Sequence, residues 1–150
     1  MSDVMERPDI DTFRRVTLVD LSGMADWLIA RLQERHPTAT SAQIVGWLRS
    51  CMDNNEFWFV CTDHTCALAG VRRVPLEPFP VAEEIFVFAR PGHEDDAEPL
   101  YRRMASWAAH QEATILRVDV HTDVTRSNIR ATVGAVIAKP HVYLRLDRQE

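Results

Sequence analysis

The chain has 150 residues, of which 46% are hydrophobic and 26% charged, a balance typical of one globular domain with its own core. Its net charge of −5 argues against a domain held to nucleic acid by bulk positive charge. No run of apolar residues approaches the roughly 20 that a membrane-spanning helix needs, and the polar, acidic N-terminus does not resemble a signal peptide. We therefore expect no membrane segment, no nucleic-acid partner and a cytoplasmic location.

The first residues, 1–11, show no apolar periodicity and are interpreted as an N-terminal arm that precedes a single domain over 12–150. Alternating residues predict a first strand over 13–19. Apolar residues at helical spacing then predict two helices, the first capped by Ser22 and the second by Ser41.

The middle of the chain is rich in β-formers. It predicts a hairpin over 57–61 and 66–74 and a third strand over 84–89. A long helix over 100–111 and a further strand over 115–121 follow. A helix between two strands of one sheet implies a right-handed crossover and a parallel pair. A short helix over 127–133, closed by Gly134, and a two-strand ribbon over 135–146 complete the chain. This order predicts an α/β fold, a mixed sheet with helices on both faces.

The element order over roughly 13–146 resembles the GNAT superfamily of N-acetyltransferases. The stretch Ser127-Asn128-Ile129-Arg130, followed by Gly134-Ala135-Val136, is similar to the family's Asn-containing helix and the Gly-Ala pair that ends it. The resemblance implies a GNAT-like, acyl-CoA N-acyltransferase fold. In an active member it also implies acetyl-coenzyme A as cofactor, which would contact residues at the positions of Phe88, Ala89, Gly92 and Asn128.

The family's most specific motif, Arg/Gln-x-x-Gly-x-Gly/Ala before the long helix, is missing. Its glycines let backbone N–H groups and the helix N-terminus approach the pyrophosphate of the coenzyme. In this chain the segment 90–100 has Asp95 and Ala97 near the glycine positions, and it carries four carboxylates: Glu94, Asp95, Asp96 and Glu98. We therefore expect no cofactor, and we expect Asp95 and Glu98 to form a capping box for the helix.

The chain also departs from the family at a residue that many members use for proton transfer. The resemblance puts Arg130 where many members have a general-acid Tyr, and Tyr143 falls on the final ribbon instead. Glu83 and Glu84, at the start of a strand, are the candidates for a general base that deprotonates an amine. A pair of acids entering a strand after a proline loop is more often solvated, so no catalytic residue is assigned firmly.

A second group of candidates surrounds the predicted hairpin. Cys61-x-x-His64-x-Cys66, with Cys51 upstream, contains four possible zinc ligands, but the spacing fits no familiar finger. Cys61 and Cys66 are more simply a cross-strand pair of free thiols. We therefore predict no metal. The tryptophans at 47, 58 and 107 are predicted to be core residues.

Together these features predict a degenerate GNAT-like domain that is non-catalytic. It would act as a structural or protein-binding component of an assembly, with a protein partner or as a homo-oligomer. The chain resembles short GNAT-like proteins encoded by tailed bacteriophages, which implies a role in a virion or its assembly and a location in the cytoplasm or a phage particle. The alternative is an acetyl-CoA-dependent N-acetyltransferase with a divergent cofactor loop.

Overall fold

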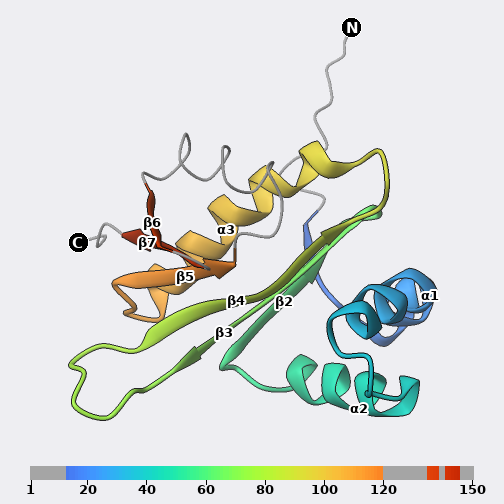
Figure 1. Cartoon of the computed structure of the whole chain (residues 1–150), viewed down its shortest axis with the longest axis horizontal. Coiled ribbons are helices and arrows are strands. Elements are labelled where there is room, and N and C mark those ends of the chain that lie inside the picture. The colour runs from blue at the N-terminus through green and yellow to red at the C-terminus, as the bar shows by residue number, and fades with distance from the viewer. Residues whose placement is uncertain (1–12, 120–134, 139–140, 146–150) are drawn as a thin grey trace, which may run out of the picture.

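The computed structural model describes residues 13–119, 135–138 and 141–145, whose strands form one seven-stranded sheet in the order β1-β2-β3-β4-β5-β7-β6 (Figure 1). The strands are β1 (Arg14–Arg15), β2 (Phe57–Cys61), β3 (Thr65–Arg72), β4 (Val81–Ala89), β5 (Ile115–Asp119), β6 (Ala135–Ala138) and β7 (His141–Arg145). The helices are α1 (Leu18–Arg35), α2 (Ser41–Met52) and α3 (Ala97–His110), and α3 follows the single 3₁₀ turn η2 (Glu94–Asp96).

The sheet is mixed. Strands β1 to β4 form an antiparallel meander, β4 and β5 are parallel, and β7 and β6 continue antiparallel from β5. Helix α3 makes the crossover between the parallel pair, and Figure 1 shows it on the opposite side of the sheet from α1 and α2. The predicted α/β architecture with helices on both faces is therefore confirmed. Within these residues, no helix is long and apolar enough to cross a membrane.

Two hydrophobic cores lie on the two faces of the sheet. The core under α1 and α2 contains the helical residues Leu28 and Leu48 and, from the sheet, Phe59 and Phe86. The core under α3 contains Leu100, Met104 and Leu116 among its fully buried residues. Each helix presents one apolar stripe to the sheet, as the helical spacing of these residues predicts.

The start of the first helix is the main difference from the sequence prediction. The strand ends at Arg15, and α1 begins at Leu18 with Thr17 as its N-cap instead of Ser22. The side chain of Thr17 accepts from the backbone N–H of Asp20 while the Asp20 carboxylate accepts from the backbone N–H of Thr17, a complete capping box. This local pairing outweighs the alternation that predicted a strand to residue 19, and it leaves Leu18 exposed.

Two smaller corrections concern α2 and the tryptophans. Thr40, in a capping box with Gln43, caps α2, and Ser41 is its first helical residue. Trp47 of α2 is exposed, with 37% of its surface accessible, so its prediction as a core residue was wrong. Trp58 and Trp107 are half-buried and stack at 6.3 Å between ring centroids, on the α3 side of the sheet. The helix predicted over 127–133 lies outside the described residues.

Candidate functional site

The two parallel strands at the centre of the sheet diverge. β4 and β5 are paired only at Ala82 with Leu116 and at Glu83 with Arg117. Beyond Glu83, β4 continues to Ala89 past the end of β5, and among the described strands none pairs with that side of it (Figure 1). The result is an open strand edge at the middle of the sheet, where the backbone of β4 is available to something other than β5.

A β-bulge lies at the point of divergence. Leu68 of β3 pairs with Phe86, but its neighbour Ala69 pairs with Glu84, so Ile85 is an extra residue on β4. A bulge changes which face the following side chains point to. Before it, Ala82 lies in the core under α3; after it, Phe86 lies in the core under α1 and α2. Glu84 shares the face of Ala82, on the α3 side of the open edge, and the bulge moves Phe86 to the opposite face.

The two candidate general bases, Glu83 and Glu84, lie in different surroundings. Glu83 accepts from two guanidinium groups, Arg72 Nε at 2.6 Å and Arg117 Nη1 at 3.0 Å. Its carboxylate is thus held in an ion-pair network that ties β3, β4 and β5 together. Glu84 is buried, with 7% of its surface accessible, and accepts from the hydroxyl of Tyr101 at 3.4 Å. Of the two glutamates, Glu84 lies beyond the last residue of β4 that pairs with β5. Its partner Tyr101 was not among the residues that the sequence predicted for the site.

The open half of β4 is covered from the α1 side by arginines. Phe88 is buried, and the guanidinium groups of Arg31 and Arg35 lie 4.7 Å and 4.9 Å from the centroid of its ring. Arg31 donates to the carbonyl of Ala89 at 3.4 Å, and Arg35 donates to the carbonyl of Ile85 at 3.2 Å. Phe88 and Ala89, predicted to contact an acyl-CoA, thus contact the chain's own arginines.

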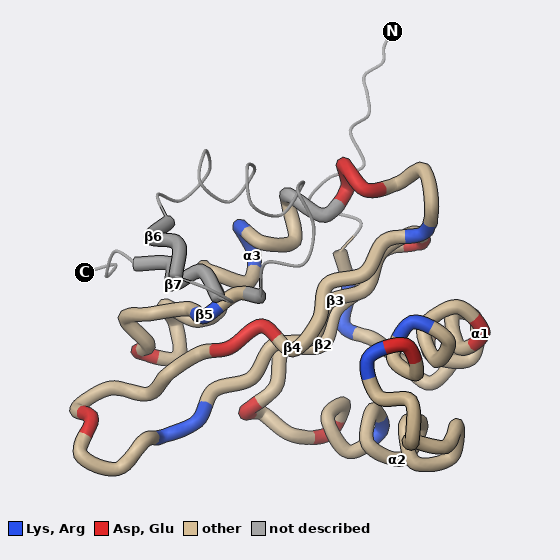
Figure 2. The backbone as a smooth tube through the Cα atoms, viewed as in Figure 1, with Lys and Arg blue, Asp and Glu red and all other residues tan. Residues whose placement is uncertain are grey.

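The loop between β4 and α3 uses its own backbone donors. Gly92 has a φ of +89°, which favours glycine, and its N–H donates to the carboxylate of Glu94 at 3.1 Å. The N–H of His93 donates to the carbonyl of Arg90 at 2.9 Å, and that of Asp96 to the carbonyl of His93 at 3.0 Å. Figure 2 shows the acidic turn that follows, directly before α3. Three backbone donors of this loop, those of Gly92, His93 and Asp96, are therefore bonded within the loop.

The predicted capping box of Asp95 and Glu98 was wrong. The acidic residues form the 3₁₀ turn, so α3 begins after Asp96, and the side chain of Asp96 makes no capping bond. Instead, Asp96 Oδ2 lies 3.3 Å from His93 Nδ1. Pro99 in the first turn has no N–H, which removes one further donor from the helix N-terminus.

A histidine pair joins this loop to the β2–β3 turn. The imidazoles of His64 and His93 stack with centroids 3.8 Å apart, and Arg90 N–H donates to the carbonyl of His64 at 2.9 Å. His64 therefore packs against the loop, away from the cysteines with which it was considered as a zinc ligand. Within the described part of the chain, no group of three or more His, Cys, Asp or Glu side chains could hold a metal ion.

The cysteines are structural. Cys61 and Cys66 are directly opposite on β2 and β3, which confirms the predicted cross-strand pair, and both are free thiols with no accessible surface. Burial, together with the Asp20 carboxylate, raises the pKa of Cys61 to about 11, and burial raises that of Cys66 well above its usual value. Such thiols are poor nucleophiles and poor metal ligands at neutral pH.

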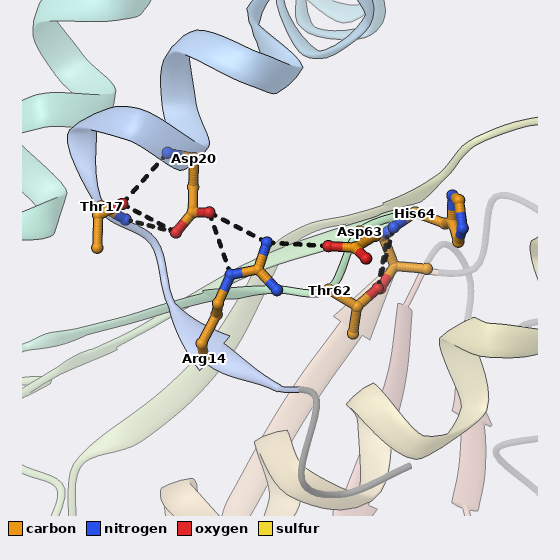
Figure 3. Close-up of polar contacts among 7 residues, drawn as sticks. Arg14, Thr17, Asp20, Thr62, Asp63 and His64 are labelled. Carbon is orange, nitrogen blue, oxygen red and sulfur yellow. Dashed lines mark hydrogen bonds and ion pairs between the residues drawn. The ribbon is translucent and has the colours of Figure 1, made fainter. Parts of the chain in front are cut away.

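A polar network at the same β2–β3 turn fixes the start of α1 (Figure 3). Arg14 lies 3.0 Å from Asp20 and 3.2 Å from Asp63 of the β2–β3 turn. Burial raises the pKa of Asp20, but hydrogen bonds from Arg14 and Thr17 outweigh it and hold the pKa of this carboxyl below its usual value. The network joins three separate segments, and its sequence signal is the Thr17-x-x-Asp20 spacing.

The remaining predicted site residues fall elsewhere. Asn128, Arg130 and Gly134 lie outside the described residues, and Tyr143 is on β7. A pocket of about 450 Å³ lies between α1 and α2, away from β4. It is lined by Leu32, His36, Thr38, Ala39, Gln43, Ile44 and Trp47, and His36 is the one titratable residue of this lining.

Comparisons with known proteins support the fold. No family model matches the sequence, and no curated protein is significantly similar to it. The fold is similar to two solved aminoglycoside antibiotic 6′-N-acetyltransferases. One is AAC(6′)-IG from Acinetobacter haemolyticus, with a TM-score of 0.62, 16% identity and coverage of 91% of this chain and 99% of that one. The other is AAC(6′)-Ih from Acinetobacter baumannii, with a TM-score of 0.58, 18% identity and coverage of 92% of this chain and 95% of that one.

A third solved structure, an acetyltransferase of the GNAT family from Listeria monocytogenes 4b F2365, has a TM-score of 0.52 at 9% identity, over 88% of this chain and 91% of that one. At these identities the likeness shows the fold alone. This chain has the GNAT acyl-CoA N-acyltransferase fold over nearly its whole length.

Proposed function

We propose that this GNAT-fold domain does not hold acetyl-coenzyme A at the loop before α3 and that it acts non-catalytically, as a protein-binding component of an assembly. The observation that carries the proposal is the hydrogen bond from Gly92 N–H to the Glu94 carboxylate. An anion supplied by the chain itself occupies a donor that a pyrophosphate would need. The role is the one that the resemblance to phage-encoded GNAT-like proteins implies, in a virion or its assembly.

Electrostatics support the same conclusion. Glu94, Asp95 and Asp96 form the turn that leads into α3. Like charges about 4 Å apart repel by about 1 kcal/mol in water and by more near a protein surface. A pyrophosphate placed here would meet three carboxylates, and His93 is already paired with one of them.

Calorimetry and thermal unfolding with about 1 mM acetyl-coenzyme A test the proposal. A ligand at 100 times its dissociation constant stabilises a fold by about 2.7 kcal/mol, so binding would be visible. We expect no heat and no shift for the natural chain. A clear upward shift would refute the proposal. The variant Glu94→Ala, which frees the Gly92 N–H, is the matched comparison, because a gain of binding in it alone would identify Glu94 as the residue that closes the site.

A second candidate function is N-acetyl transfer with a divergent cofactor loop. It is favoured by the open edge of β4 and by Glu84, which is buried beside the bulge with the Tyr101 hydroxyl bonded to it. Glu84 would then accept the proton of the amine, and release of free coenzyme A thiol in an acetylation assay would be the test. The arginines at 31 and 35 disfavour a polycationic acceptor such as the aminoglycosides named for the two Acinetobacter enzymes.

A further inference from the structure

One side of α1 forms a row of donors along the open half of β4. Trp27, Arg31 and Arg35 are spaced four residues apart, so they lie on one side of the helix. Trp27 stacks under the guanidinium of Arg90 at 5.3 Å. Arg31 and Arg35 cover Phe88 and donate to the carbonyls of Ala89 and Ile85, as described above. We call Arg31, Arg35 and Arg90 the arginine row.

The arginine row has more donors than the described residues satisfy. Glu34, whose carboxylate lies 4.0 Å from Arg31, is the one acid within ion-pair distance of any of the three in the part of the chain that the structure describes. The Nε of Arg90 and the indole nitrogen of its neighbour Trp27 are buried and have no hydrogen-bond partner among these residues. Buried donors are normally paired, and a buried donor without a partner destabilises the fold. The row therefore suits an anionic occupant.

We propose that the arginine row binds the acidic N-terminal arm of a second copy of this chain, through Asp9 and Asp11. The inference rests on the proposed protein-binding role and names the partner. Residues 1–11 contain four acids and one arginine. In an extended chain Asp9 and Asp11 are roughly 6.6 Å apart on one face, and residues four apart on a helix rise by about 6 Å. This spacing matches one carboxylate to Arg31 and the other to Arg35.

Chain length favours an arm that comes from another copy. Phe13 packs against the core under α3, with the guanidinium of Arg103 5.4 Å from its ring, whereas the arginine row lies on the α1 face. The adjoining strand β1 is also three strand positions from β4, which is roughly 14 Å. Asp11 is two residues from Phe13 and so reaches about 7 Å from it, whereas Asp9 is four residues away and reaches about 14 Å. A chain could therefore bring at most Asp9 near its own arginines, whereas the arm of a second copy, which is not tethered at this Phe13, can bring both carboxylates to them.

Binding exchanges weak contacts for stronger ones. The arginines now donate to neutral carbonyls at 3.2 Å and 3.4 Å. Carboxylates of the arm would replace these with ion pairs between two charged groups, in which the guanidinium can bond both oxygens of a carboxylate. The carbonyls of Ile85 and Ala89 would then accept from the backbone of the arm, as in strand addition to an open sheet edge. Two copies that exchange arms in this way form a closed, two-fold dimer.

Light scattering coupled to size exclusion tests the inference on the full chain. We expect the natural chain to be a dimer at about 50 µM that dissociates as salt is raised. Asp9→Asn with Asp11→Asn should weaken the dimer roughly tenfold, the effect of two such ion pairs. The matched control is Asp3→Asn with Glu6→Gln, which removes the same charge from the same arm at a spacing that does not fit the arginines. A monomeric natural chain, or equal weakening by both arm variants, would overturn the inference.

A charge exchange tests the arginines themselves. A chain with Arg31→Glu and Arg35→Glu should not dimerise alone but should pair with a chain carrying Asp9→Arg and Asp11→Arg, whereas Arg49→Glu on the exposed side of α2 should change nothing. The arm variants keep the inference testable if the arginine variant does not fold. Acetyl-coenzyme A calorimetry on the Asp9→Asn, Asp11→Asn chain separates the two proposals. Heat of binding in that experiment would refute the non-catalytic proposal. A natural chain that does not dimerise would refute the arm inference but would leave the non-catalytic proposal unaffected.

Discussion

Replacing Asp20 with alanine should destabilise the fold more than any other exposed-loop or cap substitution that the structure suggests. Its carboxylate accepts from the N–H and the hydroxyl of Thr17, both at 3.0 Å, and from Arg14 Nε at 3.1 Å, and only 12% of the side chain is accessible. Loss of an N-terminal cap costs about 1 kcal/mol, and loss of a hydrogen bond to a charged group costs about 1.5–3 kcal/mol. Because these contributions overlap, we expect a total of about 2–3 kcal/mol.

The assay is urea or thermal unfolding followed by circular dichroism. For a domain of this size about 1 kcal/mol corresponds to 2–4 °C, so the midpoint should fall by roughly 4–12 °C. Asp26→Ala is the matched control, because Asp26 is an exposed acid of the same helix. A surface substitution of this kind changes stability by no more than about 0.5 kcal/mol.

The effect should depend on pH in a specific direction. The pKa of Asp20 is lower in the folded chain than its usual value, so its contribution is fully present above the unfolded pKa of about 4 and is lost as the pH falls through the folded pKa. The difference between the natural chain and Asp20→Ala should therefore be constant between pH 5 and 8 and shrink below about pH 4. A difference that is no larger than that of Asp26→Ala, or one that does not shrink in acid, would refute the ion-pair argument.

The remaining predictions concern single substitutions and the thiols. All three cysteines should fail to react with a thiol reagent in the folded chain and react fully in denaturant, because each is at most 1% accessible. Gly46→Ala in α2 should stabilise by about 0.5–1 kcal/mol, since nothing lies within 4 Å of the added Cβ, whereas Gly92→Ala should destabilise by about 1–2 kcal/mol because of its positive φ. Asp95→Ala should change stability by less than about 0.5 kcal/mol, because Asp95 caps nothing. Tyr101→Phe should cost about 1 kcal/mol, since buried Glu84 loses a donor. Chemical unfolding measures the change in stability of each of these four variants.

The fold was predictable because periodicity survives in every long element. The switch from helical spacing before residue 53 to β-rich runs after 57 placed the hairpin correctly, and the helix between two strands gave the parallel crossover. The boundary at Thr17 was not predicted, because alternation over 13–19 and a capping box at Thr17 and Asp20 compete for the same residues. The capping box satisfies two backbone donors at once, so it prevails over a periodicity that rests on only two apolar positions.

The site was less predictable, because its geometry depends on contacts between distant segments. The sequence shows that the loop before α3 lacks glycine at two positions, but not that Glu94 accepts from Gly92. Glu83 and Glu84 look alike in the sequence. They point to opposite faces of β4, and only the fold shows that one meets Arg72 and Arg117 whereas the other is buried beside Tyr101. The spacing of Trp27, Arg31 and Arg35 was a signal that could have been found, since four-residue spacing places them on one side of a helix.

The two proposals depend on different groups beside the open half of β4. The loop before α3 presents carboxylates, and its backbone donors at Gly92, His93 and Asp96 are bonded within the loop, which is why we propose that coenzyme A is not held there. On the α1 side the same strand is lined by arginines that donate to neutral carbonyls. The proposed arm, an extended segment with two carboxylates, needs only these arginines and the strand edge. The arm could therefore bind whether or not the loop holds a phosphate, so the two experiments test the two proposals separately.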